Sequence, residues 1–392
     1  MPVNVMLAAG RRTPFGDFGR SLRDVPLAQL GAHATCAAIA AAGLDPSRLD
    51  HLVFGNVTPV DHDGYFISRK VALEAGLPVV SSALTVNRAC GSGTEAIASA
   101  ARLILSGASQ LAVAAGGENF SRVPYLLETA RWGAGRGPTT LVDGLDYTYR
   151  CPFGRELMGD TAEKLADLGN YKRDDMDAWG LMSQQRARAA IDSGFLARQI
   201  APIEVPEGKG TRLFQADEYP RAVTAEKLAS LRPAFRAGGR VTAGNSSGVT
   251  DGAAALVIGA EDALQGAGVT PEARWVDAVT IGVEPQVMGA GPAPAIGLLL
   301  EKHGLSVADI DYWEINEAFA VVNLHAEREH GIPRERTNLY GGGISIGHPP
   351  GATGIRMTIT AMHHLVDTGG QRAVIAMCLG GGQGMATLIE RV

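Results

Sequence analysis

The chain has 392 residues, of which 46% are hydrophobic and 19% charged, and its net charge is −6 at pH 7. This length predicts two or three packed lobes, and the negative charge argues against general nucleic-acid binding while leaving room for a local cationic site. The apolar stretches are too short or too interrupted to cross a bilayer, so no membrane partner is expected.

Apolar runs alternate with helical patterns along the chain, and this alternation predicts a layered α/β fold. Taken in chain order, helices are predicted at 27–43, 92–106 and 353–367, and short buried strands at 52–56, 111–117 and 373–378. The stretch from about 119 to 248 breaks the alternation with an aromatic, glycine-rich run, a helical pattern at 174–193 and several prolines. We interpret it as a long insertion that folds over the site of the first half.

The two ends of the chain resemble each other. A Gly-Leu pair, at Gly43 and at Gly304, opens a similar helical turn ahead of an apolar strand, and the offset is 304 − 43 = 261. Adding the same offset to position 90 gives position 351, so Cys90 corresponds to Gly351, close to His348 in the sequence. We interpret the ends as duplicated halves whose reactive residues meet at their junction. Chance similarity between two α/β units is the alternative.

Cys90 stands in Cys90-Gly91-Ser92-Gly93, directly before a predicted helix. The free N–H groups and the positive dipole end of that helix are expected to lower the thiol pKa, which would make Cys90 a nucleophile. The Cys90 N–H would also be free to donate to an oxyanion. The alternative is a small buried residue that packs at a turn.

Three further positions carry reactive or polar side chains next to glycine-rich turns. His348 lies in a loop with two prolines, which predicts an imidazole held in place. Cys378 ends an apolar strand, where α/β folds place ligands, although a structural cysteine fits equally well. Asn316 follows a strand and precedes a helix, so it is either a functional residue or an N-cap.

The four cysteines, at positions 36, 90, 151 and 378, predict no disulfide framework, and no spacing fits a zinc site. The first residues show no signal-peptide pattern. We therefore expect a reducing, cytoplasmic setting and no metal.

These motifs stand in the order found in the thiolase family, which the chain resembles over essentially its whole length. They are Cys-Gly-Ser-Gly, Asn-Glu-Ala-Phe-Ala, Gly-His-Pro-x-Gly-Ala-x-Gly and Cys-x-Gly-Gly-Gly-x-Gly, beginning at Cys90, Asn316, Gly347 and Cys378. The resemblance implies a duplicated five-layer αβαβα fold and a homodimer or homotetramer. It divides the chain into an N-terminal half (1–118 plus 249–270), an inserted CoA-binding loop domain (119–248) and a C-terminal half (271–392).

The resemblance also implies a ping-pong acyl transfer between CoA thioesters, a reaction of fatty acid metabolism. Cys90 would be acylated, His348 would activate it, and Asn316 would hold a water of the first oxyanion hole. Cys378 would exchange the α-proton, and the N–H groups of Cys90 and Gly380 would form a second oxyanion hole. Because one thiol cannot be acylated and act as a base at once, a second base with a near-neutral pKa is expected.

CoA is implied as a co-substrate, with no tightly bound cofactor. The positions implied to contact CoA or substrate are Arg221, Ser247, Met158, Met288 and Phe319. For Arg221 a solvated loop arginine is the alternative, and for Ser247 a cap or turn. The chain departs from the family pattern at Ala89, Leu157, Lys227 and Pro350, which leaves the acyl-chain length open.

The leading hypothesis is a thiolase that cleaves or forms 3-ketoacyl-CoA, with acetoacetyl-CoA as one candidate. A condensing enzyme of the ketoacyl synthase type shares the fold and the nucleophile, and it pairs the nucleophile with two histidines or with histidine and asparagine. A non-catalytic thiolase-like protein is the third hypothesis. The intact Cys90, His348, Asn316 and Cys378 argue against it.

Overall fold

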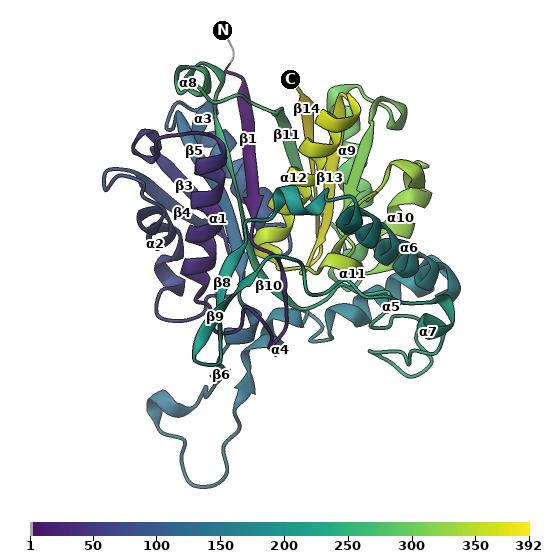
Figure 1. The fold of residues 1–392 in the computed structure, drawn as a ribbon. Helices are drawn as coiled ribbons and strands as arrows, with labels where there is room; N and C mark the ends of the chain where they lie inside the picture. The colour runs from purple at the N-terminus through teal and green to yellow at the C-terminus, as the bar shows by residue number, and fades with distance from the viewer. Residues whose placement is uncertain (1–2) are drawn as a thin grey trace.

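One ten-stranded sheet runs through the computed structural model, which describes residues 3–392 (Figure 1). The strand order is β12-β13-β14-β11-β1-β10-β5-β3-β4, and the short β2 pairs with β10. The strands of the first half are β1 (Val5–Arg12), β2 (Gly16–Asp17), β3 (His51–Gly55), β4 (Ser82–Val86), β5 (Leu111–Glu118) and β10 (Thr250–Ala260). Those of the second half are β11 (Ala273–Gly282), β12 (Tyr312–Ile315), β13 (Arg372–Leu379) and β14 (Gln383–Arg391).

The sheet has the same arrangement in both halves, so the predicted duplication is confirmed. The order β3-β5-β10-β1 on one side is mirrored by β12-β13-β14-β11 on the other, and β1 pairs with β11 at the centre. In the two halves the corresponding pairs β3 with β5 and β12 with β13 are parallel, and so is the additional edge pair of β3 with β4. The pairs β5 with β10 and β13 with β14 are antiparallel. The first residues of β3 and β12 differ by 312 − 51 = 261, the offset found in the sequence.

Helices lie in three layers that alternate with the two halves of the sheet (Figure 1). α1 covers β1, β5 and β10 on one outer face, and α9 covers β11, β13 and β14 on the other. α12 contacts β5 and β10 of the first half and also β12 and β13 of the second, so it lies between them together with α3. The helices are α1 (Leu27–Ala41), α2 (Ile67–Glu74), α3 (Ser92–Leu105), α8 (Glu261–Gly266), α9 (Pro292–His303), α10 (Ala320–His330), α11 (Gly343–Ile346) and α12 (Pro350–Thr368).

The middle layer explains why α12 is buried on nearly every side, whereas an outer helix would show one apolar stripe. α12 begins at Pro350, earlier than predicted, because proline is tolerated in the first turn of a helix. β5 and β10 are buried along their whole length, which is why they appear in the sequence as continuous apolar runs. No helix within residues 3–392 is both long and apolar enough to cross a membrane.

Glycines let the two middle helices approach closely at their N-termini. A Cβ on Gly93 would lie 2.6 Å from the Gly351 carbonyl oxygen, and a Cβ on Gly354 would lie 2.4 Å from the Thr94 nitrogen. Because these are backbone contacts, a side chain there would force the helices apart. This approach brings the turn before α3, with Cys90, next to the turn before α12, with His348.

Between β5 and β10 the chain leaves the layered body and covers one end of it, and a long loop projects outward from this part (Figure 1). Its helix α6 coincides with the helical pattern found in the sequence and packs on α10 and α11. Its elements are β6 (Tyr125–Leu126), β7 (Val142–Asp143), α4 (Gly144–Tyr149), α5 (Met158–Leu168), α6 (Arg173–Asp192), β8 (Ile203–Glu207), β9 (Gly210–Phe214) and α7 (Ala225–Ala229).

Candidate active site

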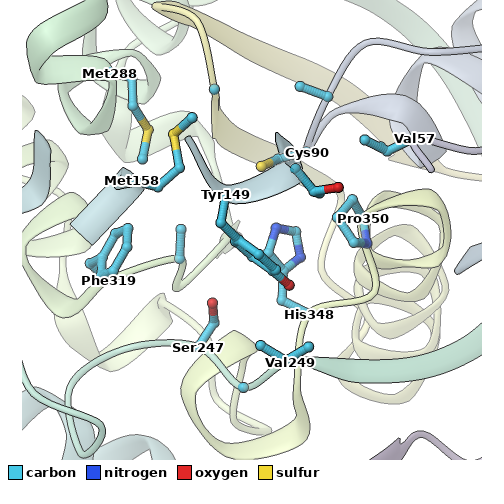
Figure 2. A pocket seen from close by; sticks show the side chains of 15 residues that line it. Val57, Cys90, Tyr149, Met158, Ser247, Val249, Met288, Phe319, His348 and Pro350 are labelled. Atoms are coloured by element: carbon cyan, nitrogen blue, oxygen red, sulfur yellow. The ribbon is translucent and has the colours of Figure 1, made fainter. Parts of the chain in front are cut away.

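Residues 119–249, between β5 and β10, are called the covering segment here. A narrow cavity of about 90 Å³ lies where both halves and the covering segment meet (Figure 2). Seven of the residues expected to act in catalysis or binding line it: Cys90, Met158, Ser247, Met288, Phe319, His348 and Gly380. The other lining residues are Val57, Ala89, Thr148, Tyr149, Gly248, Val249, Ala318 and Pro350. The cavity is therefore largely apolar, with a thiol and an imidazole facing it.

A strained turn presents Cys90 to the cavity. Ala89 has a φ of +46°, a left-handed conformation that residues other than glycine rarely adopt. Side-chain hydrogen bonds stabilise it: Ser92 Oγ donates to the Ala89 carbonyl (2.7 Å), and Asn87 Oδ1 accepts from the Ala89 N–H (3.0 Å). α3 follows directly, so the thiol lies at its N-terminus as predicted.

The expected lowering of the Cys90 pKa is wrong. The residue keeps some exposure to solvent, but burial of its sulfur raises the pKa of the thiol. The backbone N–H groups of Gly380 and of Cys90 itself, both directed at the sulfur, only partly oppose this, and the nearby Glu118 adds to it. Desolvation therefore outweighs the helix terminus, and the resting Cys90 is a thiol that needs a base.

His348 is held in one tautomer by Thr353. The His348 Nδ1 atom lies 2.7 Å from Thr353 Oγ1, and this hydroxyl donates its own proton to the Pro349 carbonyl (2.9 Å). Thr353 must therefore accept from Nδ1–H, which leaves Nε2 unprotonated. Burial, and to a lesser degree the charge of Arg356, lowers the pKa of His348 to about 3. The imidazole is neutral at physiological pH, with an unprotonated nitrogen on its other side.

Asn316 is a neighbour of this nitrogen. Its Nδ2 donates to His348 Nε2 at 3.3 Å, and its Oδ1 is buried without a hydrogen-bond partner among the described residues. The N-cap interpretation is wrong, because α10 begins only at Ala320, with Phe319 as its cap. The loop between is fixed by Glu317, whose carboxylate accepts from Trp179 Nε1 (3.0 Å) and Ser183 Oγ (2.6 Å) of α6.

Cys378 is the penultimate residue of β13 and is fully buried. It belongs to an apolar cluster with Phe319 and Met288 and does not line the cavity itself, whereas Gly380 does. Burial, reinforced by the neighbouring Cys90, raises the pKa of the Cys378 thiol well above its usual range. The expected near-neutral pKa is therefore wrong for the resting protein, in which the Cys378 thiol is protonated.

Arg221 lies outside the cavity. Its half-exposed guanidinium stacks on the Tyr219 ring, 4.4 Å from the ring centre, and is 4.0 Å from an Asp17 carboxylate oxygen. Tyr219 packs against Gly248, the neighbour of Ser247, so Arg221 is linked to the cavity wall through one ring. Ser247 donates its backbone N–H to the Ala318 carbonyl (2.9 Å) and faces the cavity (Figure 2).

Sequence reasoning missed Glu118, Thr353 and Tyr149. Glu118 is the one charged residue of β5, and its fully buried carboxylate accepts from the backbone N–H of Val57 (2.6 Å) and from Asn56 Nδ2 (3.0 Å). Burial raises the pKa of Glu118 to about 8. A lone charge at the end of an apolar strand was the available signal for Glu118. Tyr149 lies in the covering segment and had no sequence signal.

Comparison with known proteins matches the whole chain to one family. The model of the thiolase N-terminal domain matches residues 5–262, and that of the thiolase C-terminal domain matches residues 269–391. A beta-ketothiolase of Cupriavidus necator is 42% identical over the full length of both chains. Human mitochondrial 3-ketoacyl-CoA thiolase, solved in complex with CoA, superposes with a TM-score of 0.96 at 39% identity, covering 100% of this chain and 98% of the other. The acetyl-CoA acetyltransferase of Bacillus anthracis superposes with a TM-score of 0.97 at 40% identity, covering 100% and 99%.

Proposed function

The chain belongs to the thiolase family, whose acyltransferases catalyse CoA-dependent cleavage and Claisen condensation of 3-ketoacyl-CoA, and we propose the residues that carry out this reaction here. Cys90 is the nucleophile, His348 is its base, and Cys378 exchanges the proton of the α-carbon. The observation that carries the proposal is the tautomer of His348, which leaves Nε2 unprotonated in a residue that lines the same cavity as Cys90.

In the cleavage direction, His348 Nε2 accepts the Cys90 proton while the sulfur attacks the 3-keto carbon of the substrate. The bond between carbons 2 and 3 then breaks, and Cys378 protonates the acetyl-CoA enolate at carbon. CoA attacks the acyl-Cys90 thioester next, and its thiol proton replaces the one that Cys378 gave up. The bond between the acyl group and Cys90 breaks, and the departing Cys90 thiolate takes its proton back from His348. The sum is one 3-ketoacyl-CoA and one CoA converted to acyl-CoA and acetyl-CoA.

Negative charge on oxygen is stabilised at two places. The N–H groups of Cys90 and Gly380 already converge on the Cys90 sulfur, so both can donate to an oxyanion formed beside it. The other oxyanion accepts hydrogen bonds from His348, once its Nε2 is protonated, and from a water bound by the buried Asn316 Oδ1. Removal of one such donor typically costs about 3–4 kcal/mol of transition-state stabilisation.

For CoA we propose a path from the cavity past Met158, Ser247 and Phe319, with Met288 beside it and Arg221 near the phosphate-bearing end. The CoA complex of the human relative supports CoA as the co-substrate. A guanidinium that stacks on Tyr219 at the surface is suited to an anionic group. Under this proposal residues 119–248 act as the CoA-binding loop domain. A reducing compartment such as the cytoplasm fits the reaction, because Cys90 and Cys378 must stay reduced.

We also propose a homodimer formed through the first half. The edge strand β4 is exposed on both of its faces, and its neighbours include Val79 (78% exposed), Val80 (91%) and Phe66 (72%). An uncovered apolar strand edge is a ready surface for pairing with a second copy. Light scattering on the protein as it elutes from a size-exclusion column should give at least twice the chain mass of 40.9 kDa. A Leu84→Lys variant should give a lower mass. A monomeric wild-type protein would refute the dimer.

The functional proposal is tested by CoA-dependent cleavage of acetoacetyl-CoA and of 3-ketodecanoyl-CoA, with Cys90→Ala as the control. We expect cleavage of at least acetoacetyl-CoA, abolished in the variant. Activity on neither substrate, together with decarboxylative condensation of a malonyl thioester, would instead indicate a ketoacyl synthase. Intact folding without acylation of Cys90 by any acyl-CoA would indicate a non-catalytic protein.

A further inference from the structure

Glu118 collects hydrogen bonds from three segments that meet beside the reactive cavity. It is the last residue of β5, its side chain is fully buried, and the groups that stabilise its charge are all neutral N–H donors. Two are backbone N–H groups of the loop after β3, at Val57 (2.6 Å) and Thr58 (3.2 Å), and a third is Asn56 Nδ2 (3.0 Å). The fourth is the backbone N–H of Gly351 in the first turn of α12. Burial of a carboxylate without a cation is costly, which points to a role other than stability.

On one side Glu118 fixes the turn that carries His348. Gly351 follows His348 by three residues, and a Cβ on Gly351 would lie 2.3 Å from the Gly55 carbonyl oxygen and 2.6 Å from that of Gly117. Because no side chain fits there, the N-terminus of α12 rests directly on the ends of β3 and β5. The N–H groups of a first helical turn have no partner within the helix, and Glu118 accepts the one at Gly351.

On the other side the same carboxylate is connected to the turn that carries Cys90. The N–H of Val57 donates to Glu118, and the Val57 carbonyl accepts from Asn87 Nδ2 at 3.1 Å. Asn87 Oδ1 accepts from the backbone N–H of Ala89 at 3.0 Å, in the left-handed turn directly before Cys90. The turns that carry the nucleophile and the base are thus joined by a continuous path of hydrogen bonds through one buried side chain.

We propose that Glu118 is a positioning residue for acylation, which holds the Cys90 turn and the His348 turn at the separation that proton transfer between them requires. The inference rests on the proposed function, because it assigns Glu118 a role toward the proposed nucleophile and base. Proton transfer requires the base nitrogen within about 3 Å of the sulfur-bound proton's donor atom or one water away, and a misplacement of about 1 Å can cost about 100-fold in rate. Glu118 itself touches no reacting atom in this scheme.

The charge of Glu118 has a second effect, which distinguishes positioning from a purely structural role. The titratable groups near Glu118 are the Cys90 thiol and the Tyr149 hydroxyl, and the negative charge of Glu118 contributes to the raised pKa of both. Glu118 therefore opposes the ionisation of Cys90 while it positions the base that removes the Cys90 proton. Loss of the charge should thus act in opposite directions on thiol ionisation and on acyl transfer, whereas loss of a purely structural residue should impair both.

The test measures two rates on the Cys90 peptide by mass spectrometry, since Cys36 is also exposed. The first is acylation by acetyl-CoA. The second is alkylation by iodoacetamide at about pH 9, where the wild-type Glu118, with a pKa of about 8, carries its charge. Glu118→Gln keeps the shape of the side chain but directs an NH2 group at N–H donors, so the path of hydrogen bonds is broken.

Two further variants complete the test. Asn87→Ala breaks the path at an exposed residue and leaves the Glu118 charge in place, so it should fold even if Glu118→Gln does not. The matched control is Asp50→Asn. The Asp50 carboxylate accepts from the backbone N–H groups of Gln110 (2.7 Å) and Leu111 (3.3 Å) at the opposite end of β5, away from both turns.

We expect acylation to slow by about tenfold or more in Glu118→Gln and Asn87→Ala and to keep the wild-type rate in Asp50→Asn. Alkylation should be faster in Glu118→Gln, because loss of the charge lowers the pKa of Cys90, and unchanged in Asn87→Ala. Wild-type acylation in either variant, or alkylation that is not faster in a folded Glu118→Gln protein, would overturn the inference and leave the proposed function standing. A wild-type Cys90 that acetyl-CoA does not acylate would overturn both.

Discussion

Thr353 sets the protonation state of His348, and its replacement by valine tests this directly. Valine keeps the shape of the side chain and removes the hydroxyl that accepts from His348 Nδ1–H at 2.7 Å. A buried donor left without a partner costs about 1–3 kcal/mol. The same energy favours the tautomer with its proton on Nε2, which cannot accept the Cys90 proton. If this energy is added in full to the activation free energy of the acylation step, kcat/KM falls about 5- to 150-fold.

The assay is CoA-dependent cleavage of acetoacetyl-CoA, together with the rate at which acetyl-CoA acylates Cys90. Thr353→Ser is the matched control, because it retains the hydroxyl, and it should keep most of the activity. Nitrogen NMR of labelled histidine should show the His348 proton on Nδ1 in the wild-type and serine proteins, and on Nε2 in the valine variant. Equal acylation rates in the valine and serine variants would refute the assigned role of Thr353.

Two further predictions concern stability. Because burial lowers the pKa of His348 to about 3 in the folded protein, against about 6.5 when unfolded, stability is lost as pH falls below 6.5. Through this residue, the free energy of unfolding should fall by about 2 kcal/mol between pH 8 and pH 5. Urea unfolding of His348→Gln should lack that fall. An equal fall in the wild-type and variant proteins would contradict the lowered pKa of His348. Gly93→Ala places a Cβ 2.6 Å from the Gly351 carbonyl oxygen, so it should lower the melting temperature and the activity together. Gly297→Ala on α9 is its control, since the Cβ there meets only a His330 side chain at 3.2 Å, and equal effects of both changes would argue against the close helix approach.

The layered body was predictable because its signals are local. β5 and β13 are continuous apolar runs bounded by turns, and the offset of 261 between β3 and β12 is visible without any structure. The predicted start of α12 is too late, because the prolines that suggest a loop lie at or just before its first residue. The sequence predicts glycine-rich turns before α3 and α12, but it does not show that Gly93 and Gly354 let the middle helices touch.

The chemistry of the site was less predictable, because it depends on burial and on long-range neighbours. The helix terminus near Cys90 suggests a lower pKa, but desolvation of the buried thiol reverses the direction. Asn316 has the sequence context of an N-cap, and only the position of His348 gives it another role. Glu118 and Tyr149 acquire their places through contacts between distant segments, which no local pattern encodes.

The central claim is a division of labour between two thiols, and acylation with acetyl-CoA followed by mass spectrometry tests it most directly. Cys378→Ala should still gain one acetyl group on Cys90, because CoA can leave as a thiolate without a proton donor. It should fail to cleave acetoacetyl-CoA, because the carbon protonation step is lost. Cys90→Ala should gain no acetyl group and lose both activities. An acetyl group on Cys378, or full cleavage activity in Cys378→Ala, would contradict the account.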